Sequence, residues 1–262
     1  MGMEKQHLVV IGNPRTMPEV PDGSVQLVLT NPPYFDMGGC NECSAPLEDF
    51  SDHLNDMQFA FSECHRALEN GGIICVNVCD VVNYRCKFPI PAHYTLLLQR
   101  AGFEYRDELV WRKPAGSIAE MQSGIFIQHH SPLAYSPNSI LGHVLILRKG
   151  DFSSKKPGVL ERGQAMREIR EIMRFRSQDK GALQPSLYPQ ELAEALIKLY
   201  TYEGETVLDP FLNGGTTLKA AARLGRRSIG YGADIARLPS IMQGSRIAPD
   251  DLKIIGQRRL FE

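Results

Sequence analysis

The sequence VQLVLTNPPY, residues 25–34, joins an apolar strand to a loop that cannot extend it. Most of its first six residues are leucine or β-branched, which is typical of a buried strand. Pro32 and Pro33 then end the strand, because proline has a fixed φ angle and no N–H group to donate. In open α/β sheets, ligands bind at loops that follow the carboxyl ends of buried strands. The sequence therefore predicts an α/β fold with a ligand site near Asn31 and Tyr34.

The loop formed by Asn31, Pro32, Pro33 and Tyr34 suits one kind of chemistry. The exocyclic amine of a nucleobase is a weak nucleophile, because its lone pair is delocalised into the ring. Oxygen acceptors on both N–H bonds, here the Asn31 side chain and the Pro32 carbonyl, would localise that lone pair. Tyr34 would stack on a base that has left the duplex. The alternative is a proline-rich turn without chemistry, since four-residue motifs often occur by chance.

A second candidate ligand loop lies in residues 206–217, which read TVLDPFLNGGTT. Its first three residues predict a short strand, residues 218–224 a helix and residues 228–231 another strand. This order within about 30 residues is a βαβ unit of the kind that binds nucleotides. The glycines let the backbone approach a ligand, and the helix N-terminus presents N–H groups to it.

Apolar periodicity predicts the other elements of one large α/β domain. Strands are expected at residues 7–11, 73–82, 103–111 and 142–147, and helices at residues 47–68, 92–100 and 189–199. Asn70-Gly71-Gly72 is expected to end the first of these helices, because glycine is common at helix C-termini. Gly12-Asn13-Pro14 follows the first strand and forms a further turn at a ligand-loop position.

The charge of the chain restricts how it could bind nucleic acid. The net charge is −1, so any nucleic-acid surface must be a local patch. Residues 148–180 hold ten Lys and Arg against five Asp and Glu, which suits phosphate contacts. A solvated helix face is the alternative for this segment. No apolar run is long enough to span a membrane, and the N-terminus lacks a signal-peptide pattern, so a cytoplasmic protein is expected.

All six cysteines lie between residues 40 and 86. Cys40 and Cys43 form a single C-x-x-C pair, and a zinc site would need two further ligands from Cys64, His65 or Cys86. Reduced cysteines without a metal are the favoured interpretation. Cys75 and Cys79 lie in an apolar run, where core positions are expected.

The two loops together resemble those of the DNA amino-methyltransferases, which make N6-methyladenine or N4-methylcytosine from S-adenosylmethionine. TNPPY matches the catalytic motif of that family, and LDPFLNGGTTLKAAARLGRRSIG matches its cofactor segment. The chain is most similar to the circularly permuted class, in which the catalytic loop precedes the cofactor loop. The resemblance implies a doubly wound, mostly parallel, Rossmann-like sheet in a single domain over residues 1–262, with residues 114–183 as target-recognition region.

The resemblance also implies the roles of individual residues and the partners of the protein. Asn31, Pro32, Pro33 and Tyr34 would be catalytic, and S-adenosyl-L-methionine would be the cofactor. The residues expected to bind that cofactor are Asn13, Asn31, Gln184, Pro185, Asp209, Pro210, Phe211, Asn213, Gly215, Thr216, Thr217 and Asp234. The substrate would be double-stranded DNA, with N6 of adenine favoured over N4 of cytosine. A homodimer, a restriction partner and an RNA substrate remain open.

Three positions depart from the family pattern. Asn213 stands where the first glycine of F-x-G-x-G is usual, and Asn13 where an aspartate is common. Gly232 occupies the position of the acidic residue that holds the ribose, so Asp234, two residues further on, is the candidate replacement. These changes motivate an alternative, a DNA-binding protein on the same scaffold with weakened cofactor binding.

Overall fold

The computed structural model describes residues 6–33, 47–83, 86–112, 125–127, 135–137, 141–151, 164, 167, 188–232, 239 and 247–256. Within these residues the main feature is an eight-stranded sheet with the strand order β12-β1-β11-β10-β2-β3-β9-β6. The six strands from β12 to β3 are parallel to their neighbours, and β9 and β6 are antiparallel additions. The predicted mostly parallel α/β sheet is thereby confirmed.

The helices and strands have the bounds that follow. The strands of the main sheet are β1 (His7–Ile11), β2 (Val25–Thr30), β3 (Leu68–Val78), β6 (Glu104–Arg112), β9 (Leu141–Arg148), β10 (Thr206–Asp209), β11 (Arg227–Gly232) and β12 (Leu252–Gly256). Two separate hairpins pair β4 (Val81–Asn83) with β5 (Cys86–Phe88) and β7 (Ile125–Ile127) with β8 (Tyr135–Pro137). The helices are α1 (Leu47–Ala67), α2 (Ile90–Arg100), α4 (Gln190–Tyr200), α5 (Thr216–Arg223) and the short 3-10 helix η4 (Pro249–Asp251).

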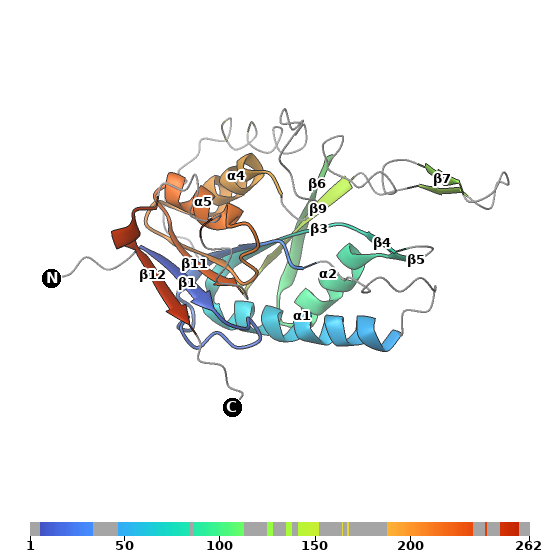
Figure 1. Ribbon diagram of the computed structural model, residues 1–262, viewed down its shortest axis with the longest axis horizontal. Helices are drawn as coiled ribbons and strands as arrows, with labels where there is room; N and C mark the ends of the chain where they lie inside the picture. The colour runs from blue at the N-terminus through green and yellow to red at the C-terminus, as the bar shows by residue number, and fades with distance from the viewer. Residues whose placement is uncertain are drawn as a thin grey trace.

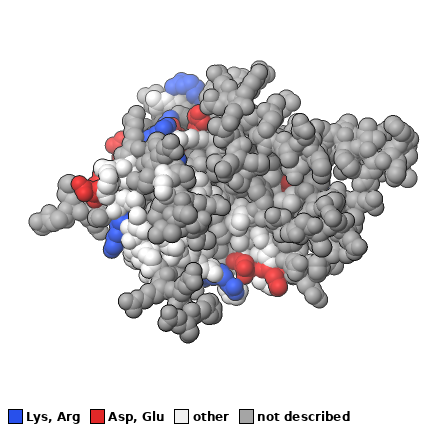
Figure 2. Space-filling model, viewed as in Figure 1, with Lys and Arg blue, Asp and Glu red and all other residues white. Residues whose placement is uncertain are grey.

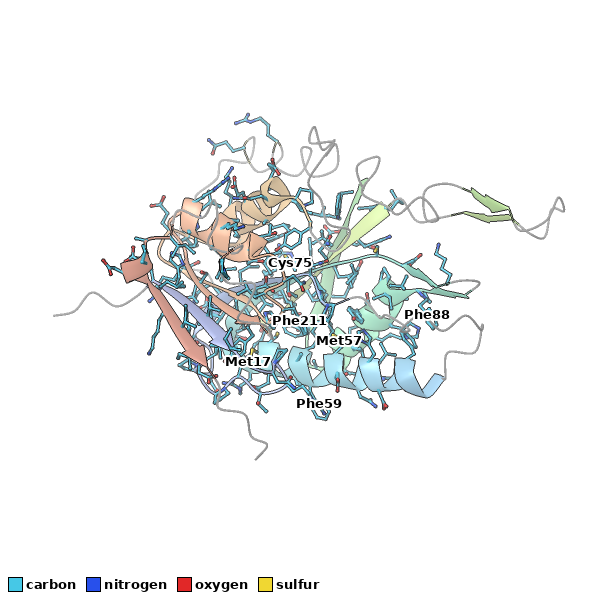
Figure 3. The ribbon with its side chains drawn as sticks, in the orientation of Figure 1. Met17, Met57, Phe59, Cys75, Phe88 and Phe211 are labelled. Carbon is cyan, nitrogen blue, oxygen red and sulfur yellow. The ribbon has the colours of Figure 1, made fainter. Side chains whose placement is uncertain are left out.

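Helices cover both faces of the main sheet (Figure 1). On one face, α1 and α2 bury Phe61 and Tyr94 against strand residues such as Val28. On the other face, α4 and α5 bury Leu196 and Ala220 against strand residues such as Leu29. Figure 3 labels one residue from each side, Met57 on the α1 side and Cys75 on the α4 side. Successive side chains of a strand point to opposite faces, so a continuous apolar run such as β2 is buried on both.

The chain winds in opposite directions from β2 and from β10, which are neighbours at the centre of the sheet. From β2 it passes through α1 to β3 on one side, and from β10 through α5 to β11 on the other. The point where the winding reverses leaves a crevice at the carboxyl ends of the two strands, and ligands bind in such crevices. Both candidate ligand loops begin there, one at Asn31 and the other at Pro210.

Two expectations for the region after α1 were wrong. The helix ends at Ala67, and Asn70-Gly71-Gly72 belongs to β3 instead of forming a helix stop. The Lys149 ammonium group ends the helix by donating to the carbonyl oxygens of His65 and Leu68 at 2.6 and 2.7 Å. The expected strand 73–82 is also divided, since β3 ends at Val78 and β4 starts a separate hairpin. The other expected elements are present, with ends shifted by one or two residues.

The cysteines that the structure describes are core residues. Cys64, Cys75 and Cys79 are buried and unbridged, as expected for the last two. Cys40, Cys43 and the side chain of Cys86 lie outside the described residues. Among the described residues, no His, Cys, Asp and Glu side chains gather into a group that could hold a metal ion. In the same part of the chain, no helix combines the length and apolar character needed to cross a bilayer.

Candidate active site

The two ligand loops are joined directly at the carboxyl edge of the sheet. β2 and β10 pair in parallel, with Val207 opposite Leu27 and Leu208 opposite Val28. Beyond the strands, the side-chain amide of Asn213 donates to the backbone carbonyl of Asn31 at 2.8 Å. Asn213 stands where the family usually has glycine, so this bond between the loops is made by one of the departures from the family pattern.

A pocket of about 190 Å³, open to solvent, lies between the two loops. The residues that line it are Asn31, Tyr188, Asp209, Phe211, Asn213, Gly214, Gly215 and Thr216. Gly215 precedes the first residue of α5 and has a φ of 72°, a left-handed conformation that glycine adopts without steric cost. Neither glycine carries a side chain, so their backbone is open to a ligand in the pocket. Phe211 is labelled in Figure 3.

A buried carboxylate, Asp209, organises the start of the glycine loop. One of its oxygens accepts hydrogen bonds from the Thr30 hydroxyl at 2.7 Å and from the backbone N–H of Phe211 at 3.1 Å. The other accepts from the Thr217 hydroxyl at 2.7 Å. Tyr188 and Thr217 place their hydroxyl oxygens 2.6 Å apart. Burial raises the pKa of Tyr188 well above its usual value, so the neutral phenol donates to Thr217.

The pKa of Asp209 is raised because burial penalises its charged form more than its three hydrogen-bond donors favour it. As the pH rises above the ordinary value of 3.8, the unfolded chain therefore loses this proton before the folded chain does. The folded state then loses stability until the pH passes the folded pKa. Asp209→Asn lacks this proton, so the stability of the parent should fall relative to that of Asp209→Asn as the pH rises through this window. Urea unfolding of both proteins between about pH 3.5 and 7 measures the difference, and a constant difference would contradict the assignment.

Asn31 is held by a second line of buried polar side chains on the other side of β2. Asn77 of β3 donates from its side-chain nitrogen to the Asn31 side-chain oxygen at 2.8 Å. Trp111 of β6 donates from its indole N–H to the Asn77 side-chain oxygen at 2.9 Å. All three side chains are at most 4% exposed. The orientation of the Asn31 amide is thus tied to two residues distant in sequence.

The structure brings together most of the predicted site residues that it describes. Asn31, Asp209, Phe211, Asn213, Gly215 and Thr216 line the pocket, and Thr217 bonds to Asp209. Pro32 and Pro210 are buried beside them, whereas Pro33 is exposed. Asn13 is exposed and does not line the pocket; its side chain accepts from the N–H of Arg15. Tyr34, Gln184, Pro185 and Asp234 lie outside the described residues.

Five residues at or behind the pocket were missed by the sequence reasoning: Thr30, Asn77, Trp111, Tyr188 and Gly214. One of them carried a usable signal. Asn77 interrupts the apolar run IICVNV at residues 73–78, and a buried amide in such a run needs hydrogen-bond partners. The others have no local pattern that distinguishes them from core or loop residues.

Comparisons with known proteins show the family. A family model described as DNA methylase matches residues 25–243. The type II methyltransferase M.MjaI of Methanocaldococcus jannaschii is 30% identical over 276 residues, which cover 90% of this chain and 89% of that protein. M.BglII of Bacillus subtilis, also a type II methyltransferase, is 27% identical over 250 residues, 89% of this chain and 67% of that protein. The chain therefore belongs to the N6/N4 family of DNA methylases, the DNA amino-methyltransferases.

Solved structures agree with this assignment. TTHA0409 of Thermus thermophilus, titled a DNA modification methylase and solved with S-adenosyl-L-methionine, has a TM-score of 0.71 and 26% identity. That match covers 96% of this chain and 99% of the other. The cytosine-N4-specific PvuII DNA methyltransferase has a TM-score of 0.63 at 16% identity, which shows a common fold. The Rossmann-like methyltransferase fold expected from the sequence is confirmed.

Proposed function

We propose that this DNA methyltransferase transfers a methyl group from S-adenosyl-L-methionine to N6 of adenine in duplex DNA. The proposal depends chiefly on one observation: the Asn31 loop and the glycine loop meet at one pocket, joined by the Asn213–Asn31 hydrogen bond. A methyl donor held by the glycine loop would then lie beside an amine held by Asn31. The pocket residues fit such a donor, since they combine bare glycine backbone, an aromatic ring and amide side chains.

The residues of the catalytic loop would act on the target amine through hydrogen bonds and stacking. The Asn31 side-chain oxygen and the Pro32 carbonyl would accept the two N–H bonds of a flipped base, and Tyr34 would stack on its ring. The bound S-adenosyl-L-methionine would supply a sulfonium-linked methyl group. The acceptors localise the lone pair and hold the nitrogen in line with that methyl group, so placement and fixed dipoles provide the acceleration.

The amide of Asn31 favours adenine over cytosine as the target. An amide offers one acceptor and one donor, which match the edge of adenine, whereas carboxylates are the usual acceptors for the cytosine N4 amine. Incubation of unmethylated genomic DNA with labelled cofactor, followed by digestion to nucleosides and mass spectrometry, identifies the product. N6-methyladenine is expected. N4-methylcytosine would overturn the choice of base, and label found only in RNA would overturn the choice of substrate.

We also propose that residues 114–183 recognise the target sequence. The β7–β8 hairpin lies in this region and forms a sheet separate from the main one, at the far right of Figure 1. Arg167, one of the basic residues of the segment, is exposed. On the face drawn in Figure 2, the charged side chains of the described residues are scattered and form no single basic patch. Phosphate contacts from residues 148–180 would therefore supplement the part of the surface that Figure 2 colours.

The ribose contact provides a direct test of the altered cofactor site. β11 ends at Gly232, and a Cβ atom there would lie 3.8 Å from the Leu212 Cβ, an ordinary contact distance. Gly232→Glu is therefore expected to be tolerated and to leave cofactor affinity unchanged or tighter, because a carboxylate is a strong acceptor for hydroxyls. Asp234→Ala is expected to raise the dissociation constant of S-adenosylmethionine in calorimetry. Parent-like affinity in Asp234→Ala would mean that another residue holds the ribose.

A further inference from the structure

Three buried polar side chains lie in register on one face of the sheet. Leu29 is opposite Cys75 and Thr30 opposite Val76, so Asn31 and Asn77 are the next pair along β2 and β3. On the following strand, Asn77 is opposite Val144. Trp111 comes from β6, two strands away from β3, and is opposite Gly142 of β9.

Gly142 creates the space through which Trp111 reaches Asn77. A Cβ atom at residue 142 would lie 2.4 Å from the indole nitrogen of Trp111 and 2.5 Å from the neighbouring ring carbon. Such distances do not occur between real atoms, so the indole ring occupies the position that any other residue at 142 would fill. The ring therefore crosses above β9, and its N–H group meets the Asn77 oxygen at 2.9 Å.

The direction of the hydrogen bonds in this line is set by its tryptophan end. An indole N–H can only donate, so the oxygen of Asn77 must face it and the Asn77 nitrogen must face Asn31. The Asn77 nitrogen also only donates, so the oxygen of Asn31 must face Asn77. Rotation of the Asn31 amide by half a turn would place two donors against each other in a buried site. An amide oxygen can accept two hydrogen bonds, so this bond is compatible with a second one from a target amine.

We propose that Trp111 and Asn77 are positioning residues that fix the orientation of the Asn31 amide for methyl transfer. This inference rests on the proposed role of Asn31 as acceptor of the target amine. Trp111 would set the polarity, Asn77 would transmit it, and Gly142 would leave room for the ring. Neither Trp111 nor Asn77 lines the pocket, so both act on the reaction through Asn31.

The sharpest test is Asn77→Asp, which keeps the shape of the side chain and removes its donor. The carboxylate still accepts from Trp111, but its second oxygen now faces Asn31 and favours the rotated amide. The single-turnover rate of methyl transfer on unmethylated genomic DNA should fall by about tenfold or more. The dissociation constant of S-adenosylmethionine should remain within about twofold, because Asn77 does not touch the pocket.

Trp111→Phe tests the same inference without placing a charge in the core. It keeps an aromatic ring at the site and removes the indole N–H, so a loss of roughly threefold to tenfold in the same rate is expected. Val144→Ala is the matched control, since Val144 is buried on the same face and truncation there weakens packing without touching the line. Its single-turnover rate should equal that of the parent even if its thermal stability falls.

Trp111 is the only tryptophan in the chain, so its fluorescence reports on this line of residues alone. Asn77→Leu removes the acceptor of the indole N–H and should shift the emission to shorter wavelength. Gly142→Ala should displace the ring and change both the emission and the rate. Val144→Ala should change neither in the same way, which separates loss of the hydrogen bond from general loosening of the core.

The double variant distinguishes failure of this inference from failure of the proposed function. If Asn31→Ala turns over like the parent, the acceptor role of Asn31 is wrong. If Asn31→Ala is slow but Asn77→Asp and Trp111→Phe both match the parent, the acceptor role stands and the positioning role is wrong. The expected result is that Asn77→Asp slows the parent and has no further effect in the Asn31→Ala background, as required of a residue that acts through Asn31.

Discussion

Asn31→Ala is expected to reduce the single-turnover rate of methyl transfer by a factor on the order of a hundred or more. The substitution removes the side-chain oxygen that would accept one N–H bond of the target amine. The backbone carbonyl that accepts from Asn213 remains, so the junction between the two loops should persist. Cofactor affinity measured by calorimetry should therefore change little.

Asn31→Asp is the matched control for this variant. A carboxylate of the same shape can accept from Asn77 and from a target amine, so activity should remain within about tenfold of the parent. A rate near that of the parent in Asn31→Ala would contradict the acceptor role. Equal losses in both variants would point to the nitrogen of the amide, rather than its oxygen, as the group that matters.

Asp209→Ala is expected to lower the free energy of unfolding by about 3 kcal/mol, the largest loss of stability predicted for this protein. The variant removes the buried acceptor of the Thr30 hydroxyl and the Phe211 N–H group. Thr217 can redirect its proton to the Leu29 carbonyl, whose oxygen is 3.2 Å away, so two donors remain without an acceptor. Urea unfolding measures the loss, and the loosened loop should also bind S-adenosylmethionine more weakly.

Asp209→Asn separates the hydrogen bonds from the charge. Its side-chain oxygen can still accept from Thr30 and Phe211, and its nitrogen can donate to the Thr217 hydroxyl oxygen. Its stability near neutral pH should therefore lie within about 1 kcal/mol of the parent. A similarly small loss in Asp209→Ala would show that the carboxylate is not needed to hold the glycine loop to β2.

Local patterns in the sequence predicted the elements on both sides of the site. The apolar run before Asn31 became β2, and the turn after Leu208 became the loop that leads into α5. These features are local, because prolines, glycines and apolar periodicity act within a few residues. The same reasoning failed at Asn70-Gly71-Gly72, where the Lys149 ammonium group ends α1 from more than 80 residues away.

The sequence by itself determined the class of fold, the two loops and the residues that form them. Only the tertiary structure decided which of those residues meet. Thr30 and Asp209 are 179 positions apart, and Asn213 reaches Asn31 across 182 positions. Asn77 and Trp111 became part of the site because β3, β9 and β6 pair in one register and Gly142 leaves space for an indole ring. Such contacts depend on strand order and register, which follow from packing of the whole sheet and leave no pattern in neighbouring residues.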